Sequence, residues 1–349
     1  MPTVRSVGSE GLESLEPAAS KPSWQRPLIR VLSLGVSTAL LVFLYRRIDM
    51  RMVGQSLRRA DPFWLVVSLS MIVPITLLRA VRFYWVAPAG ALTGLGEALR
   101  LTLVASALNV FVPGKAGDLI KSYFVRKRGG GSTGAAVAIV VYERLCDLFG
   151  LIFWCMVGWL VARPVTARVP PAIWPLLGTI GVVALVLISS QRVAGLSRFI
   201  VVKALPHPKL RRLRNLAEGW PDLVQRLHGR RMGVVLFSLF LWLVHVIQMW
   251  MFTLALSVRI PFTVCASLSA VALMAGQLPF TLGGLGARDM ALVVLLAGYM
   301  RPEAAAAMGI LIATRGLLPP LAALPIMRPY LTIAIEEARG VAIRNRPGE

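Results

Sequence analysis

The hydrophobic positions of this 349-residue chain fall into long, nearly continuous apolar runs. A transmembrane helix needs about 17–25 mostly apolar residues, and six runs meet this requirement. These six runs cover residues 28–45, 62–86, 133–162, 172–190, 232–257 and 304–327. The pattern therefore predicts an all-α fold: a polytopic integral membrane bundle with about six full crossings.

Two further apolar regions, 97–128 and 263–300, are each interrupted by proline and glycine. The first interruption reads NVFVPGKAGDL (109–119) and the second reads GQLPFTLGGLGARDM (276–290). Backbone that is not helical survives at membrane depth only inside protein or beside a water-filled cavity. We therefore expect two re-entrant hairpins. The alternative is a pair of ordinary crossings that are kinked by proline and glycine.

The sequences directly after the two interrupted regions resemble each other. Small residues begin the next helix in both cases, and an arginine lies about nine residues further on, Arg144 in one and Arg315 in the other. The repeat motifs thus extend over 97–162 and 263–327. Three crossings separate the two hairpins, so we expect them to enter the membrane from opposite faces. That arrangement is the inverted repeat of many transporters.

Charged residues lie deep inside the apolar run 133–162. Glu143 is ten residues from the start of the run, or about 15 Å at 1.5 Å per residue, which is near the midplane. A charge at that depth costs at least about 2.5–3.5 kcal/mol, so Glu143, Arg144 and Asp147 should face inward and pair. Glu143 and Asp147 share a helix face, and Arg144 can pair with Asp147 one turn away.

Arg315 has a similar depth and no acidic residue near it in the sequence, so its partner should be Asp118, Asp289 or an anionic ligand. The deep charges are either a structural ion-pair cluster or the lining of a polar cavity for a head group. The second interpretation is favoured, because ionisable residues inside a membrane usually mark function. Arginines and the starts of half-helices favour an anionic group such as a lipid phosphate. The candidate residues of the head-group path are Pro113, Lys115, Gly117, Asp118, Glu143, Arg144, Asp147, Gly283, Gly284, Gly286, Arg288, Asp289 and Arg315.

Four other polar residues lie in apolar runs. His245 and Gln248 are three residues apart on one helix face, and we expect them to bond neighbouring helices rather than a metal. Arg79 and Arg82 lie near the end of a crossing. We expect them to snorkel toward the interface, with an inward-facing role as the alternative.

The net charge of +22 bears on orientation. Basic residues cluster in loops beside apolar spans, which argues against nucleic-acid binding. Segment 191–231 holds ten basic and two acidic residues, so the positive-inside rule predicts a cytoplasmic loop. Segment 46–61, with five basic and two acidic residues, then falls on the opposite side and disagrees with the rule.

Composition sets the remaining limits. Hydrophobic residues make up 56% of the chain and charged residues 15%, and the mean hydropathy is +0.70. We expect a disordered polar tail over 1–24, one membrane domain over 25–330 and a short polar tail over 331–349, which leaves no soluble catalytic domain. The cysteines form no C-x-x-C pair, so we expect packing residues rather than a disulfide framework or metal site; they are Cys146, Cys155 and Cys265. No Walker A, H-E-x-x-H or G-x-S-x-G motif occurs, and we expect no cofactor and no enzymatic activity.

The motifs at both breaks together resemble the lysylphosphatidylglycerol synthase transmembrane-region family, the flippase-like membrane proteins, over about residues 28–330. The family's first pattern, Pro-x-Arg-x-Gly-Glu and then Glu-Arg-x-x-Asp, is matched by Pro113, Lys115, Gly117, Asp118, Glu143, Arg144 and Asp147. Its second pattern, a proline followed by Gly-Gly-x-Gly and an acidic residue, is matched by Pro279, Gly283, Gly284, Gly286 and Asp289. Lys115 and Asp118 replace the more usual arginine and glutamate, which keeps the charge but loses the bidentate geometry of arginine.

The resemblance implies a stand-alone lipid-handling protein of the cell envelope. Bifunctional relatives carry a separate soluble domain that adds lysine to phosphatidylglycerol, and this sequence contains none. We expect a plasma (inner) membrane protein that translocates or binds an anionic or amphiphilic lipid: a phospholipid, a polyprenyl-phosphate glycan or a hopanoid-type lipid. The first alternative is a membrane scaffold whose partner is an envelope lipid- or glycan-modifying enzyme. The second is a membrane-embedded enzyme that uses Glu143 and Asp147.

Overall fold

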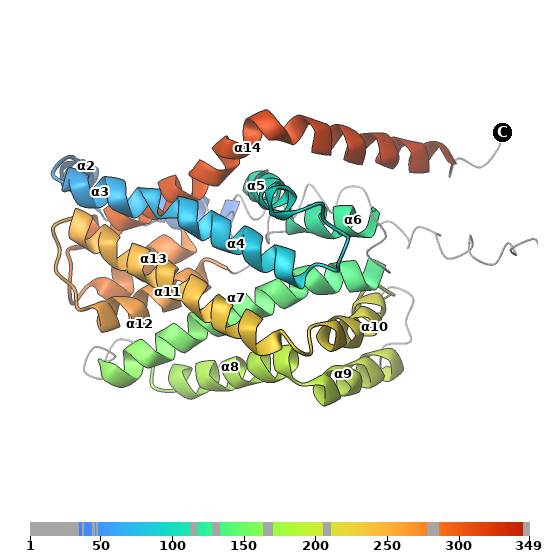
Figure 1. Cartoon of the computed structure of the whole chain (residues 1–349). Coiled ribbons are helices and arrows are strands. Elements are labelled where there is room, and N and C mark those ends of the chain that lie inside the picture. The colour runs from blue at the N-terminus through green and yellow to red at the C-terminus, as the bar shows by residue number, and fades with distance from the viewer. Residues whose placement is uncertain are drawn as a thin grey trace, which may run out of the picture.

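The computed structural model describes residues 35–36, 38–43, 46, 48–111, 117–127, 133–162, 170–204, 211–277 and 286–344, and within these it contains helices and no strand (Figure 1). This confirms the all-α prediction. The helices are α2 (Met50–Arg58), α3 (Pro62–Ser70), α4 (Ile72–Val86), α5 (Leu95–Phe111), α6 (Leu119–Lys127), α7 (Thr133–Val161), α8 (Ile173–Ser189), α9 (Gln191–Ala204), α10 (Arg211–Arg226), α11 (Arg231–Ala255), α12 (Phe262–Ala275), α13 (Ala287–Leu296) and α14 (Pro302–Arg344).

Three helices in the described part of the chain are long and apolar enough to cross a membrane: Pro62–Val86, Arg231–Ala255 and Pro302–Tyr330. Their outer faces carry large apolar side chains; Val66 on α3 and Leu236 on α11 are 65% and 57% exposed. An apolar surface of this kind suits hydrocarbon as the solvent. The chain is therefore a multi-pass membrane protein.

Helix starts follow local chemistry. Asp61 caps α3, because its carboxylate accepts hydrogen bonds from the backbone N–H groups of Phe63 (2.9 Å) and Trp64 (3.3 Å). Prolines occupy the first positions of α3 and α14, where the missing N–H group has no intrahelical partner to lose. Further along α14, four prolines lie inside the helix, and Figure 1 shows that α14 is bent.

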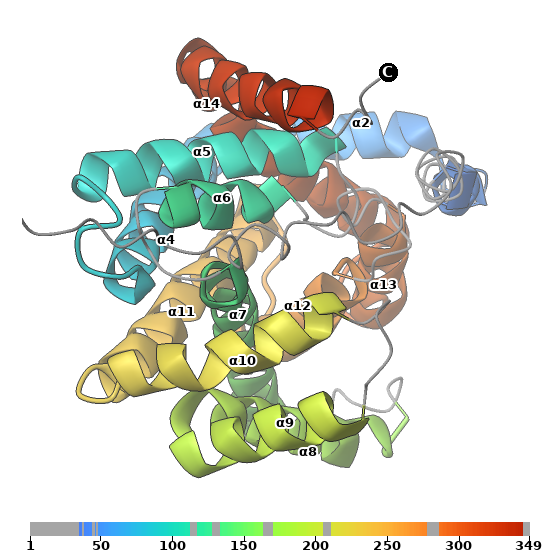
Figure 2. The same ribbon diagram turned by 90° about the vertical axis from the view of Figure 1, so that its right-hand side faces the viewer.

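Contacts between helix ends define two ends of the bundle. At one, the Asp61 end, the backbone N–H of Asp61 donates to the carbonyl of Ala255 at 2.8 Å, and the rings of Trp159 and Trp174 stack with their centroids 4.9 Å apart. At the other, the Arg231 end, the guanidinium of Arg231 donates to the carbonyl of Ser189 at 2.5 Å. The combined α3–α4 span, α7, α8 and α11 each run between these ends. Viewed along the bundle, α7 is central and contacts α6, α8, α10, α11 and α12 (Figure 2).

Within its described residues, the first interrupted region contains two helices, α5 and α6. The region begins at the Arg231 end, because α4 ends there with Trp85 against Phe237 of α11 at a centroid distance of 4.8 Å. At the start of the second arm, Gly117 packs directly on α5. A Cβ at this position would lie 2.6 Å from the backbone nitrogen of Asn109. Only glycine permits this approach between the two arms.

The second interrupted region, α12 and α13, begins at the opposite end of the bundle. Gly158, near the end of α7, packs so closely on the start of α12 that a Cβ would lie 2.5 Å from the carbonyl oxygen of Thr263. After α13 the chain returns to the Asp61 end, where Tyr299 and Met300 share a pocket with Leu256. The helices α5 and α12, with which the two interrupted regions begin, therefore start at opposite ends of the bundle.

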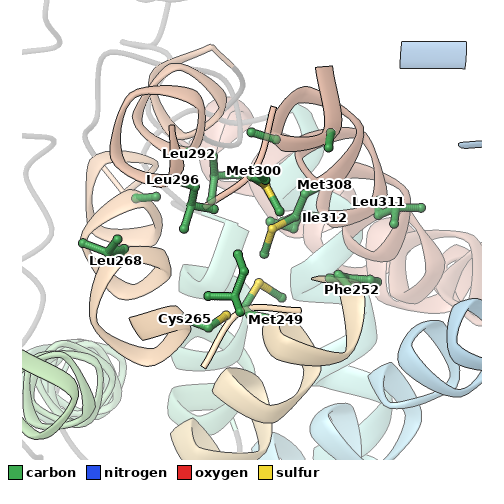
Figure 3. Close-up of a cluster of buried hydrophobic side chains, with 14 of the residues drawn as sticks. Met249, Phe252, Cys265, Leu268, Leu292, Leu296, Met300, Met308, Leu311 and Ile312 are labelled. Carbon is green, nitrogen blue, oxygen red and sulfur yellow. The ribbon is translucent and has the colours of Figure 1, made fainter. Parts of the chain in front are cut away.

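The core between α11, α12, α13 and α14 is apolar and close-packed (Figure 3). Met249 and Phe252 of α11 and Leu292 of α13 are fully buried in this core. The cysteines are free thiols in buried positions, as packing residues should be.

Some segments differ from the prediction. Segment 191–231, expected to be a loop, contains α9 and α10. Segment 46–61 contains α2, and α14 continues to Arg344, so most of the predicted polar tail over 331–349 is helical. The tail expected over 1–24 lies outside the described residues.

Candidate functional site: an ionic cluster beside a cavity

A cavity of about 330 Å³ lies where both interrupted regions meet α4, α7 and α14. Asp118 and Lys121 come from the first region, and Arg288 comes from the second. The lining residues are Arg79, Arg82, Thr102, Ser106, Asn109, Val110, Asp118, Lys121, Glu143, Arg144, Arg288, Ile312, Ala313, Gly316 and Leu317. Segments that are far apart in the sequence thus bring their charged residues to one place inside the bundle.

Arg82 is the centre of the ionic cluster. Its guanidinium lies 2.8 Å from Asp147 and 3.7 Å from Glu143, and it donates to the hydroxyl of Ser238 at 3.3 Å. Arg82 is only 2% exposed, so the prediction that it snorkels to the interface is wrong. The carboxylates of α7 neutralise its charge inside the bundle.

The predicted pair on α7 forms, and two further partners come from the first interrupted region: Asp118, directly before α6, and Lys121 on α6. Arg144 lies 3.7 Å from Asp147, as its one-turn spacing predicts, and it also forms an ion pair with Asp118. Lys121 forms an ion pair with Glu143 at 3.2 Å. The sequence analysis missed Lys121. Its spacing of three residues from Asp118 could have revealed it, because residues at that spacing lie on one side of a helical turn.

Arg288 and Asp289 form a second ion pair at the start of α13. Both Nε and Nη2 of Arg288 donate to Oδ1 of Asp289, at 3.0 and 2.7 Å. The other carboxylate oxygen accepts from the backbone N–H of Gly286 at 3.1 Å. Gly286 has φ +90°, a conformation that glycine adopts without strain. On α14, Gly309 leaves the space for Asp289, since a Cβ there would lie 2.6 Å from Oδ1.

Arg315 has a neutral partner. Its Nη1 donates to Oε1 of Gln248 at 2.6 Å, and Nε2 of Gln248 donates to the carbonyl of Ser68 at 2.6 Å. Asp118 and Asp289, the carboxylates expected for Arg315, pair instead with Arg144 and Arg288. Within the described residues, Arg315 has no ion pair.

Arg79 also binds a neutral group, so the snorkelling expected of it is wrong as well. Its Nη2 lies 3.1 Å from Nε2 of His245, and Nδ1 of His245 lies 2.9 Å from the carbonyl of Leu241. A carbonyl only accepts, so Nδ1 carries the proton and Nε2 is the acceptor for Arg79. His245 and Gln248 thus bond neighbouring helices, as the sequence predicts.

The site carries more positive than negative charge. Among the described residues it has six cations and four carboxylates: Arg79, Arg82, Lys121, Arg144, Arg288 and Arg315 against Asp118, Glu143, Asp147 and Asp289. The two cations without a carboxylate are Arg79 and Arg315. An anion is the ligand that would neutralise them.

Most of the candidate path residues lie at this site. Asp118, Glu143, Arg144 and Arg288 line the cavity. Asp147 and Asp289 are bound to lining residues, and Gly117 and Gly286 shape the arms of the breaks. Arg315 is not a lining residue, but its neighbours Ala313 and Gly316 on α14 line the cavity, and its guanidinium is bound to Gln248. Four candidates lie outside the described residues: Pro113, Lys115, Gly283 and Gly284.

Comparison with known proteins agrees with this architecture. The family described as "Lysylphosphatidylglycerol synthase TM region" matches residues 30–323. A UPF0104 membrane protein of Methanothermobacter thermautotrophicus is 23% identical over 267 residues, which cover 69% of this chain and 77% of that protein. The matched family region contains both interrupted regions and the whole ionic cluster. The chain belongs to the lysylphosphatidylglycerol synthase TM region family.

Proposed function

We propose that this protein binds the head group of an anionic or amphiphilic lipid in the cavity and moves it between leaflets, as a flippase does. The observation that carries the proposal is the surplus of cations over carboxylates at the site. A purely structural cluster would be close to neutral. Two unneutralised charges at membrane depth cost about 5–7 kcal/mol on insertion scales, which an anionic ligand would offset.

The cavity wall also supports a ligand with an apolar part. Val110 and Leu317 line the cavity beside the charged residues, and they are 37% and 50% exposed. A polar chamber whose rim continues into a lipid-facing apolar surface fits an amphiphile. The head group would lie among the arginines while the chains remain in hydrocarbon.

The arrangement of the helices supports movement rather than static binding. We propose about six full crossings and two re-entrant hairpins, related as an inverted repeat, with the cavity where the hairpins meet. Such repeats alternate access to a site near the midplane. The site would lie in the plasma (inner) membrane, with segment 191–231 on the cytoplasmic side.

We also propose that the protein is not an enzyme and that membrane lipids are its partners. An embedded enzyme would need free carboxylates, but Glu143 and Asp147 are both bound to Arg82. Ion-paired carboxylates of this kind are poor general acids and bases, because a nearby cation favours the ionised form.

The test is a leaflet-resolved translocation assay in proteoliposomes with a fluorescent phosphatidylglycerol. The label in the outer leaflet is quenched chemically, and the label that becomes accessible over time reports translocation. We expect translocation by the wild type and its loss in Arg144→Ala and in Arg315→Ala. The matched control is Arg328→Gln, an exposed arginine on the same helix as Arg315, which should translocate as the wild type does.

Thermal unfolding in detergent verifies that each variant is folded. Translocation by both alanine variants at the wild-type rate would refute the role of the cavity. No translocation of any lipid by folded wild type, together with an enzyme that co-purifies, would favour the scaffold instead.

A further inference from the structure

We propose that Arg79 and Arg315 form a subsite for a doubly charged phosphate, so that the preferred ligand carries a phosphomonoester rather than a phosphodiester. This inference rests on the proposed function, because Arg79 lines the cavity and Arg315 lies between lining residues of α14, and it adds the chemical class of the head group.

The neutral partners of the two arginines are the first observation. Arg79 is held by His245 and Arg315 by Gln248, and these partners are three residues apart on α11. Residues at that spacing are neighbours on one helix face. The two arginines are therefore held by neighbouring positions on one face of α11, and neither of them forms an ion pair within the described residues.

The remaining hydrogen-bond capacity of Arg315 is the second observation. Its Nη1 is used by Gln248, and its Nε is buried without a hydrogen-bond partner in the described part of the protein. Nε and Nη2 form the edge with which arginine makes bidentate contacts to phosphate oxygens, and Nε has no hydrogen bond within the described residues that a ligand would have to displace. Arg79 lines the cavity, and so do Ala313 and Gly316, the neighbours of Arg315 on α14.

The other cations of the site are already neutralised. Arg82, Lys121, Arg144 and Arg288 each pair with a carboxylate. Two positive charges therefore remain for the ligand. A phosphomonoester carries about −1.5 to −2 at pH 7, because its second pKa is about 6, whereas a phosphodiester carries one negative charge. The phosphomonoester matches the surplus charge, and the phosphodiester leaves one arginine unpaired.

Direct binding to purified protein tests the inference. Calorimetric titration would compare dihexanoyl phosphatidic acid, a phosphomonoester, with dihexanoyl phosphatidylglycerol, a phosphodiester with the same chains. One additional charge-assisted hydrogen bond is worth about a factor of ten in Kd, so at pH 7.5 we expect phosphatidic acid to bind about tenfold tighter. At pH 5 the ligand loses its second charge, and the preference should disappear.

The variants Arg79→Gln and Arg315→Gln should each reduce the preference, and the double variant should abolish it. Both should fold, since their partners are neutral and the substitution leaves no unpaired carboxylate. Arg328→Gln is the control and should keep the wild-type preference. Inorganic phosphate, titrated alone, identifies the source of the ligand. If it binds with the same pH dependence and competes with phosphatidic acid, the subsite takes free phosphate; if it does not bind, the subsite takes the lipid.

Equal affinity for the two lipids at pH 7.5 would overturn the subsite while leaving the proposed lipid binding intact. A preference that survives in the double variant would also overturn it. Failure of both lipids to bind folded wild type would overturn the subsite and the proposed function together.

Discussion

Removing the charge of Arg82 tests the ionic cluster most directly. Arg82→Gln deletes the ion pair with Asp147 at 2.8 Å and the longer one with Glu143 at 3.7 Å. Breaking a buried ion pair from one side costs about 3–5 kcal/mol, because the remaining charge stays buried without its partner.

For Arg82→Gln we expect the free energy of unfolding to fall by about 3 kcal/mol, near the lower limit of that range. Asp147 keeps the indole N–H of Trp242 at 3.2 Å and Arg144 at 3.7 Å, and Glu143 keeps Lys121 at 3.2 Å. Neither carboxylate is therefore left without a positive or hydrogen-bonding neighbour.

The assay is the free energy of unfolding in mixed micelles, measured by titration with a denaturing detergent. The double variant Arg82→Gln with Asp147→Asn removes both charges of the short pair. It should be less destabilised than the sum of the two single variants, which is the signature of direct coupling. Arg328→Gln should change stability by no more than about 0.5 kcal/mol, as surface substitutions usually do. The reasoning fails if Arg82→Gln costs no more than this control, or if the two single effects are additive.

Two other predictions concern packing and orientation. Gly158→Ala should destabilise the protein by about 1–3 kcal/mol through overpacking, since its Cβ would lie 2.5 Å from the carbonyl oxygen of Thr263. The control is Gly233→Ala, which should not destabilise the protein because no atom lies within 4 Å of the added Cβ. Equal unfolding free energies for the two variants would contradict this packing. His228→Cys and Arg301→Cys replace exposed residues near opposite ends of the bundle, and the native cysteines are buried. In intact cells an impermeant maleimide should label the cysteine at 301 and not the one at 228; the reverse pattern would invert the proposed orientation.

Much of the architecture follows from the cost of polar groups in hydrocarbon. Because of that cost, Pro113 and Gly117 in an apolar region predict an interruption of the helix. For the same reason, Glu143, Arg144 and Asp147 are predicted to face the inside of the bundle. The breaks and the α7 cluster could be predicted because each is a violation of the apolar pattern in a short stretch of sequence.

The partners of these groups could not be predicted in the same way. Arg82 is four residues from the end of α4, a position that suits snorkelling equally well, and only the packing of α4 on α7 decides between the two. The amide partner of Arg315 could not be predicted from the sequence, because Gln248 is 67 residues away.

The helix α10 was missed for a different reason. Its basic composition is typical of a cytoplasmic loop, whereas the helical signal lies in the spacing of its apolar residues. Trp220, Leu223, Val224 and, just beyond the helix, Leu227 are all buried. This spacing of three, four and seven residues is the apolar stripe of an amphipathic helix.

The side-chain amide of Gln248 joins three helices, since it donates to Ser68 on α3 and accepts from Arg315 on α14, both at 2.6 Å. If the amide were rotated by 180°, its nitrogen would face the guanidinium of Arg315, and its oxygen would face the carbonyl of Ser68. Both contacts would then be lost, because one would join two donors and the other two acceptors. A sliding motion of α14 past α11 would therefore have to break both contacts at once. Conformational exchange that preserves this junction must shift α3, α11 and α14 as a single body, and the displacement must occur against α6 and α7.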